Sequence, residues 1–273
     1  MKAAAFDFYR PKTLDQACEL LARYQGECRI LAGGQTLIPT LAMRIATPGS
    51  LIDISAIESL RTTRVESGEL VVSAMVRQAA LEKSLGKEFM HPALSAVLPW
   101  VAHPPIRHRG TVCGSIAHAD PSAELALALV TLRGRVLAQS AHRKRFISAD
   151  QFFLGTLQTC LEPNEMIVEA RFPLLESEAR VGFAEFGYRH GDFAVVSVLV
   201  IRDSAGVRLG FGGIDDSPRG FYFPRLSQAS ELKAQIAQLA GHLNVRSDPN
   251  ASASFRRHLM CSLGDQVIRQ AWA

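Results

Sequence analysis

The 273-residue chain lacks the short motifs that mark several common classes of protein. None of its five cysteines forms a C-x-x-C pair, so we expect no zinc site, no iron–sulfur cluster and no metal ligand in this chain. There is no Walker A loop and no G-x-G-x-x-G fingerprint, which argues against a Rossmann site. Without a G-x-S-x-G motif or a cysteine beside a plausible base, we also expect no catalytic residue.

The sequence has little that would direct it to a membrane or to a nucleic acid. Its most apolar stretch, LALALVTL at 125–132, is too short to span a bilayer. The net charge of +4 is spread along the chain and no Lys/Arg block occurs. The start, MKAAAFDFY, is not a secretory signal. These features, together with an odd number of scattered cysteines, predict a cytoplasmic protein with reduced thiols, no membrane span and no nucleic-acid partner.

The composition, 48% hydrophobic and 21% charged, is typical of a folded protein, and the length suits two domains. Local patterns predict an α+β fold. After Pro173 a short acidic linker at 174–180 leads to strands followed by helices, which indicates a separate C-terminal module. We expect helices at 13–24, 93–102, 120–133, 230–240 and 252–271, and strands at 29–32, 51–54, 70–74, 181–188, 194–202 and 207–211.

Two glycine-containing segments resemble each other chemically. In Ala32-Gly33-Gly34-Gln35-Thr36 a short strand ends in two glycines, an amide and a hydroxyl. An isolated Gly-Gly is either a plain turn or a nest of N–H groups that binds an anion. Residues 110–115, GTVCGS, repeat the pattern. Two such segments favour a ligand with two phosphates, because a pyrophosphate needs several N–H donors without steric bulk.

The charged residues beside the second segment have more than one interpretation. His103, His108 and His118, with Asp120 and Glu124, are possible metal ligands, although their spacing matches no usual metal motif. The arginines at 107 and 109 are either solvated, paired with acids, or placed to offset phosphate charge.

The Asp120-Pro121 pair predicts a helix start, with Asp120 as its cap and Pro121 in the first helical position. Glu124 would then lie one turn into that helix. It would compensate the helix dipole, or accept a hydrogen bond from a polar ligand placed over the helix start.

Four segments taken together resemble the flavin-binding medium subunit of molybdenum hydroxylases, the xanthine dehydrogenase and carbon monoxide dehydrogenase family. They are AGGQT at 32–36, HPPIRHRGTVCGSIAHADPSAE at 103–124, RHGDFAVV at 189–196 and DPNASASFRRHL at 248–259. The resemblance covers nearly the whole chain. It implies an FAD-binding domain at 1–175 similar to vanillyl-alcohol oxidase (PCMH-type), with α+β lobes at about 1–55 and 56–175. A C-terminal domain at 178–273 would follow, with helices and a three-stranded antiparallel sheet.

The resemblance also implies which residues hold FAD. The two glycine segments would contact its pyrophosphate and flavin ends, and Glu124 would contact the cofactor. Asp120 matches the acid of the family's His/Ala-Asp-Pro turn, and Ile167 falls where the family has an aliphatic flavin contact. The implied site residues are Ala32, Gly33, Gly34, Gln35, Thr36, Thr111, Val112, Cys113, Gly114, Ser115, Asp120, Glu124 and Ile167.

The implied function is electron transfer. A large subunit with a molybdopterin cofactor would hydroxylate the substrate, a small subunit with two [2Fe-2S] clusters would pass electrons to FAD in this chain, and an outside acceptor would take them. The assembly would be a dimer of heterotrimers. The alternative is a free-standing FAD-dependent oxidoreductase whose C-terminal module caps its own substrate. A flavin- or nucleotide-binding module without activity is a third interpretation.

Two residues depart from the family pattern. Cys113 stands where the family has the first of two glycines, and it would be strained if that position requires a positive φ angle. Glu185 occupies a position where several relatives carry a lysine near the flavin, so a lysine contact is not expected here.

Overall fold

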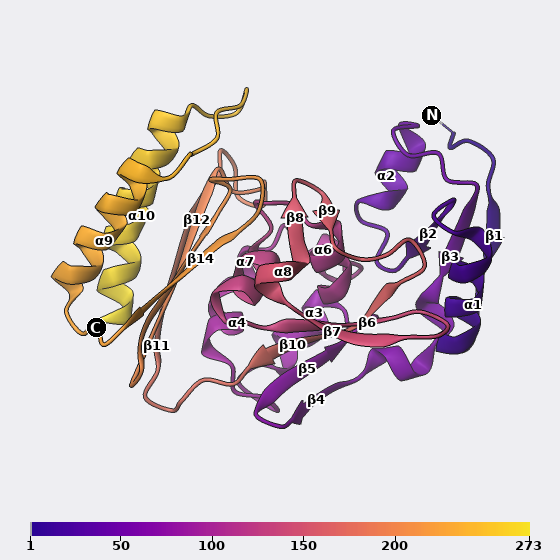
Figure 1. Ribbon diagram of the computed structural model, residues 1–273, viewed down its shortest axis with the longest axis horizontal. Helices are drawn as coiled ribbons and strands as arrows, with labels where there is room; N and C mark the ends of the chain where they lie inside the picture. Colours follow the sequence, from indigo (N-terminus) through magenta and orange to yellow (C-terminus); the bar gives the residue numbers. More distant parts are fainter. Residues whose placement is uncertain (1) are drawn as a thin grey trace.

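The structure, a computed structural model, describes residues 2–273 and is built from successive layers of helices and sheets. Figure 1 shows the C-terminal helices at one end, then the C-terminal sheet, a layer of helices, the central sheet and the small N-terminal lobe. No helix within residues 2–273 is both long and apolar enough to cross a membrane.

The N-terminal lobe is a three-stranded parallel sheet in the order β1-β3-β2, with a helix packed against it. The first helix begins after Thr13, whose hydroxyl accepts a hydrogen bond from the amide of Gln16 (3.3 Å), which confirms the helix predicted at 13–24. The elements of the N-terminal lobe are β1 (Asp7–Tyr9), α1 (Leu14–Tyr24), β2 (Cys28–Leu31), α2 (Leu37–Ala42) and β3 (Ser50–Asp53), followed by 3₁₀ turns η1 (Ile54–Ala56) and η2 (Glu58–Arg61).

The central lobe is a five-stranded antiparallel sheet in the order β4-β5-β10-β6-β7, covered on one face by helices. Its strands are β4 (Thr63–Glu66), β5 (Glu69–Ser73), β6 (Arg135–Gln139), β7 (Lys144–Ser148) and β10 (Met166–Pro173), and β8 (Phe153–Gly155) pairs with β9 (Gln158–Thr159) beside it. Its helices are α3 (Gln78–Ser84), α4 (Pro92–Val97), η3 (Leu98–Trp100), α5 (Pro104–Arg107), α6 (Val112–His118), α7 (Glu124–Thr131) and α8 (Ala149–Phe152).

The C-terminal module has four antiparallel strands rather than the three that the resemblance implied. The additional strand is β14, whose sequence RGFYFP alternates between exposed and half-buried residues. The strands predicted at 194–202 and 207–211 form the β12–β13 hairpin, and Asp203 pairs with Gly206 at its turn. The elements are β11 (Arg180–Phe186), β12 (Val196–Asp203), β13 (Gly206–Gly212), β14 (Arg219–Pro224), α9 (Ala229–His242) and α10 (Ala253–Ala271).

The expectation that Asp120 caps a helix and Pro121 begins it is wrong. Ala119 adopts a left-handed conformation (φ 55°) that ends α6, and the Asp120 carboxylate accepts a hydrogen bond from the Ser122 amide (2.8 Å) in a turn. The next helix, α7, therefore starts at Glu124, which is its first residue and does not lie one turn inside it.

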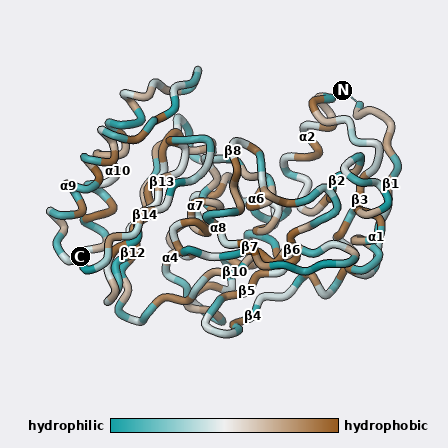
Figure 2. The backbone as a smooth tube through the Cα atoms, viewed as in Figure 1, coloured by the Kyte–Doolittle hydropathy of each residue, from teal (hydrophilic) through white to brown (hydrophobic). Residues whose placement is uncertain are grey.

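Two apolar cores hold these layers together. The larger core joins both N-terminal lobes and also includes Phe183, Leu199 and Ile201 of the C-terminal sheet, and the smaller one lies between that sheet and α9 and α10. Helix α7 lies between the two sheets, and Figure 2 shows its hydrophobic residues at this central position. The C-terminal module therefore packs against the rest of the chain through the face of its sheet that is turned toward the N-terminal lobes.

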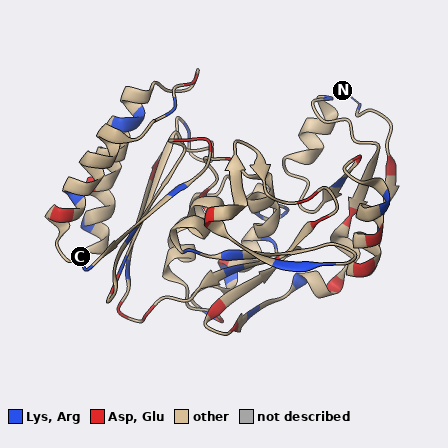
Figure 3. Ribbon diagram, viewed as in Figure 1, with Lys and Arg blue, Asp and Glu red and all other residues tan. Residues whose placement is uncertain are grey.

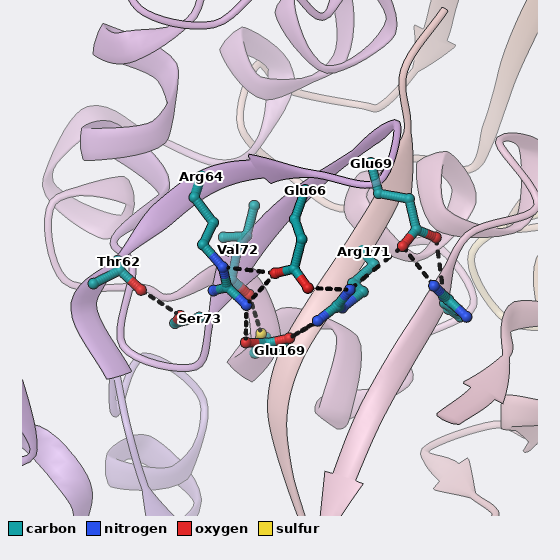
Figure 4. A network of polar contacts seen from close by, with 10 residues as sticks. Thr62, Arg64, Glu66, Glu69, Val72, Ser73, Glu169 and Arg171 are labelled. Carbon is teal, nitrogen blue, oxygen red and sulfur yellow. Dashed lines mark hydrogen bonds and ion pairs between the residues drawn. The ribbon is translucent and has the colours of Figure 1, made fainter. Parts of the chain in front are cut away.

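A network of charged residues covers the part of the central sheet that β4, β5, β10 and β6 form. The Arg171 guanidinium lies 2.7 Å from the Glu169 carboxylate and 3.6 Å from that of Glu69, and Arg64 also bonds Glu169 (2.7 Å), as Figure 4 shows. Arg171 is only 7% exposed, so these ion pairs are partly shielded from water. Figure 3 shows that Lys and Arg continue onto the edge strand β7, where charges discourage pairing with another sheet.

Candidate functional site

The two glycine segments predicted from the sequence meet in space. A Cβ atom built on Gly33 would lie 2.7 Å from the carbonyl oxygen of Arg109, 2.8 Å from the Cα of Gly110 and 3.0 Å from the nitrogen of Thr111. Only a residue without a side chain allows this approach of backbone to backbone. Gly34, with φ +70°, turns the chain from β2 into α2.

A hollow of about 450 Å³ opens at this contact. Of the predicted residues, Ala32, Gly33, Gly34 and Gln35 line it, whereas Thr36 is the residue that precedes α2. A second hollow, of about 310 Å³, lies at the far end of the C-terminal sheet and contains no predicted residue. The lining of the first is completed by Leu31, Ile38, Pro39, Asp53, Ser55, Arg77 and Arg109.

The backbone N–H groups of the first segment are available to a ligand. The amides of residues 33–36 make no hydrogen bond within the described chain, residues 2–273, while the Gln35 side chain donates to the Gly33 carbonyl (3.1 Å) and fixes the turn. Adjacent free N–H groups at a turn form a site for an anion.

The second segment is not the bare loop that we expected. Residues 112–118 form helix α6, with Thr111 as its cap: the Thr111 hydroxyl accepts from the Gly114 amide (3.1 Å) and its carbonyl accepts from the Ser115 amide (3.1 Å). The Val112 amide donates to the Val76 carbonyl (3.1 Å). The segment GTVCGS begins a helix because Thr111 is a good cap, so most of its N–H groups already have partners.

Three predicted residues point their side chains into the core instead of the hollow. Val112, Cys113 and Ile167 are at most 5% exposed. The Cys113 thiol lies 3.5 Å from the Val72 carbonyl, and burial raises the pKa of this thiol to about 12. Cys113 is helical and does not have a positive φ, so the strain considered for it is absent.

Two arginines give the hollow a positive charge. Arg77 and Arg109 both line it, and burial, with repulsion from Arg61 and Arg109, lowers the pKa of Arg77. Arg77 is not among the residues predicted from the sequence; the signal that could have found it is its position shortly after the buried strand β5. The hollow's one acid, Asp53, is paired with Arg10 (3.3 Å).

Arg107, by contrast, is a structural residue. It is 8% exposed, donates to the Glu82 carboxylate (2.9 Å) and donates to the carbonyls of Val101 (2.9 Å) and Ala102 (3.1 Å). Of the three interpretations left open for this arginine, pairing with an acid is the one that the structure shows.

Glu124 lies apart from the hollow, beyond the opposite end of α6. It is 3% exposed, and burial, followed by repulsion from Glu185, raises the pKa of its carboxyl to about 8. Burial also raises the pKa of Glu185 to about 7. Glu124 and Glu185, whose pKa values are raised, do not line the hollow at the Gly33–Gly34 turn. They form a second polar region of the molecule.

The histidines considered as metal ligands are dispersed. His103 stacks on His190 with ring centroids 5.7 Å apart, and His190 in turn lies 6.5 Å from the ring of Trp100. The part of the chain that the structure describes contains no group of three or more His, Cys, Asp or Glu residues placed to hold a metal ion.

The chain matches a known family and several characterised proteins. The family model for the FAD binding domain in molybdopterin dehydrogenase matches residues 4–175. The chain is 37% identical over 283 residues to the 6-hydroxypseudooxynicotine dehydrogenase complex subunit alpha of Paenarthrobacter nicotinovorans, covering 99% of this chain and 96% of that protein. It is 33% identical over 285 residues to the caffeine dehydrogenase subunit beta of Pseudomonas sp. (strain CBB1), covering 99% and 96%.

Solved structures agree with this match. A chain of carbon monoxide dehydrogenase from Hydrogenophaga pseudoflava has a TM-score of 0.93 at 25% identity, covering 100% of this chain and 99% of that one. A chain of quinoline 2-oxidoreductase from Pseudomonas putida 86 has a TM-score of 0.91 at 29% identity, covering 99% and 98%. The chain therefore belongs to the family of FAD-binding domains of molybdopterin dehydrogenases, as the FAD-carrying medium subunit of a molybdenum hydroxylase.

Proposed function

We propose that the hollow between the Gly33–Gly34 turn and the start of α6 holds the pyrophosphate of FAD. The observation that carries this proposal is the juxtaposition of unpartnered amides at residues 33–36 with the guanidinium groups of Arg77 and Arg109. A pyrophosphate matches that donor set in charge and in hydrogen bonding. The volume of about 450 Å³ accommodates part of a dinucleotide, so the remainder of FAD would extend beyond it.

The extension of FAD would follow α6 toward α7. The seven-residue helix α6 spans about 10 Å, at 1.5 Å per residue, and leads from Thr111 at the hollow to Asp120 and Glu124. In this arrangement Gly114 and Ser115, on partly exposed positions of α6, lie along the cofactor, and Val112, Cys113 and Ile167 support the site from the core.

The chain's own residues would position FAD and neutralise it. Arg77 and Arg109 would offset the phosphate charge, the Gly33–Gly34 backbone would orient the pyrophosphate, and the buried Glu124 and half-buried Glu185 would meet its flavin end. Bound FAD would supply the redox chemistry that links the partner's iron–sulfur clusters to an external acceptor. Glu185 would place a carboxyl at the flavin end of FAD, where several relatives carry a lysine, so the charge at that end would differ from theirs.

Finer features of the fold and assembly belong to the same proposal. We assign residues 1–175 to a PCMH-type FAD-binding domain similar to vanillyl-alcohol oxidase, with lobes at 1–55 and 56–175, and residues 178–273 to the C-terminal domain. The three-stranded sheet of the N-terminal lobe, the five-stranded sheet of the central lobe and the separate smaller core of the C-terminal module support these boundaries. We further propose that the complex is a cytoplasmic dimer of heterotrimers with the molybdopterin and iron–sulfur subunits.

The test compares the lone chain with the reconstituted complex. The purified chain should be yellow, and acid should release FAD that mass spectrometry identifies. In stopped-flow spectroscopy the organic substrate of the complex should bleach the flavin only when both partner subunits are present. A folded chain with no affinity for FAD would contradict the site.

The same experiment separates this function from a free-standing oxidoreductase. Bleaching of the lone chain's flavin by the substrate, at the rate of the complex, would mean that substrate reacts directly at the flavin. Chemically reduced lone chain should nevertheless be reoxidised by an added acceptor, since that half of the reaction takes place in this subunit.

A further inference from the structure

A row of polar residues lies on the C-terminal sheet, on the face that is turned toward the FAD-binding domain. Side chains alternate across a strand, and Phe183 and Leu199 belong to the core shared with the N-terminal lobes. Glu185 and Ser197, two positions further along the same strands, must therefore lie on that face too. They are direct cross-strand partners, and Ser197 is opposite Gly212 on β13.

Helix α7 presents Glu124 to this row. A Cβ atom on Gly210 would meet the side chains of Leu127 and Thr131, so these two residues face β13. Glu124 precedes Leu127 by three positions and Thr131 by seven, and it shares their helix face. Leu127 also lies 3.7 Å from a Cβ built on Gly212, which places the first turn of α7 beside the row that contains Glu185 and Ser197.

The polar atoms in this row lack partners. Ser197 is fully buried, and neither its hydroxyl oxygen nor the Oε2 atom of Glu185 makes a hydrogen bond within residues 2–273. Leaving a buried polar atom without a partner costs about 1–3 kcal/mol. Such atoms in a native chain indicate a ligand or a proton that satisfies them.

The neighbouring charges that act on the Glu124 carboxyl are acids. Repulsion from Glu185 and from Asp120 adds to the effect of burial on the Glu124 carboxyl, and burial alone acts on that of Glu185. Two carboxylates cannot both ionise in a buried site without a compensating charge. The arginines of the neighbouring strands are engaged elsewhere: Arg208 with Asp203, Arg219 with Asp215, and Arg202 over the ring of Trp272.

We propose that Glu124 and Glu185 share one proton at neutral pH, and that this carboxyl pair, together with the Ser197 hydroxyl, forms a polar contact site for the flavin end of FAD. The second half rests on the proposed function. A singly protonated pair offers one donor and one acceptor, so it suits a ligand edge that also presents both, as an imide edge does. The pair becomes acceptor-only when its last proton leaves.

Infrared spectroscopy of the flavin-free chain tests the shared proton. At pH 7 the wild-type chain should show the C=O stretch of a protonated carboxyl, shifted in D₂O, and Glu124→Gln/Glu185→Gln should lack it. The exposed control Glu88→Gln should keep the band unchanged. Because an amide resembles a carboxyl in shape, the double variant should fold, which circular dichroism checks. Absence of the band from wild type at pH 7 would overturn the shared proton.

The affinity for FAD tests the contact. Loss of the last proton, with a pKa of about 8, should weaken FAD binding about tenfold between pH 7 and pH 9. Glu124→Gln/Glu185→Gln should bind FAD with an affinity that does not change over this range, and Glu88→Gln should follow wild type. An infrared band without any pH dependence of wild-type binding would overturn the contact. Failure to bind FAD at any pH, with the band intact, would contradict the proposed function and leave the shared proton standing.

Discussion

Substitution of Gly33 by alanine tests the contact between the two glycine segments most directly. The added Cβ would lie 2.7 Å from the Arg109 carbonyl oxygen and 2.8 Å from the Gly110 Cα, where a carbon atom normally sits about 3.5–4.0 Å from its neighbours. Both neighbours are backbone atoms, so no side chain can rotate to relieve the overlap. The segments must therefore separate by several tenths of an ångström or more.

The magnitude follows from the usual cost of overpacking, about 1–3 kcal/mol. The flavin-free chain can relieve that strain by moving the Gly33–Gly34 turn away from α6. FAD must contact both segments, so binding would restore the strain. At about 1.4 kcal/mol per factor of ten, the dissociation constant of FAD should rise about 5- to 150-fold.

The assay is titration of the flavin-free chain with FAD, followed by flavin fluorescence, together with urea unfolding. Gly241→Ala is the matched control, because a Cβ there meets no atom within 4 Å and alanine favours helix α9 by up to about 1 kcal/mol. The control should bind FAD as wild type does. A folded Gly33→Ala chain with wild-type affinity would refute the reasoning that FAD bridges the two segments.

Four further predictions concern charge. Arg77→Met should weaken FAD binding about tenfold and reduce its dependence on salt, as isothermal titration at two ionic strengths would show, because a cation that faces the phosphates is lost. Arg171→Met should lower the free energy of unfolding in urea by about 1.5–3 kcal/mol, since Glu169 keeps only Arg64 and Glu69 keeps only Arg135 as a partner; no loss would mean that Arg171 adds nothing to the network. The pKa values of Glu124 and Glu185 are raised to about 8 and about 7, so the folded chain retains protons that the unfolded chain releases. The contribution of these two carboxyls to the free energy of unfolding should therefore fall as the pH rises from about 5 to 8. Glutamine at both positions should remove that slope. Burial lowers the pKa of His91 to about 4, which has the opposite consequence: stability should fall on acidification from about pH 6.5 to 4, and His91→Asn should flatten this part of the urea-unfolding profile.

Local patterns in the sequence were sufficient for part of the fold, and they missed other elements, among them β1, β4, β6 and β7. Helix α1, the parallel strands β2 and β3, and the strands β12 and β13 follow from a cap and from apolar patterns that act over a few residues. The fourth C-terminal strand was missed because its residues are exposed or half-buried and give a weak alternation. The helix start at Asp120 was misplaced because a left-handed residue before it, invisible in the composition, redirected the chain.

By itself the sequence predicted the Gly33–Gly34 turn, whose amides are free of partners within residues 2–273, and its motifs identified the family. Local chemistry suffices for that, since glycine and threonine act on their own backbone. Only the tertiary structure decided which charges accompany that turn: it brought Arg77 to the hollow, withdrew Arg107 to Glu82, and set Glu185 near Glu124. Each of these outcomes depends on contacts between residues distant in the chain, where burial and proximity, rather than residue type, fix the electrostatic role of a side chain.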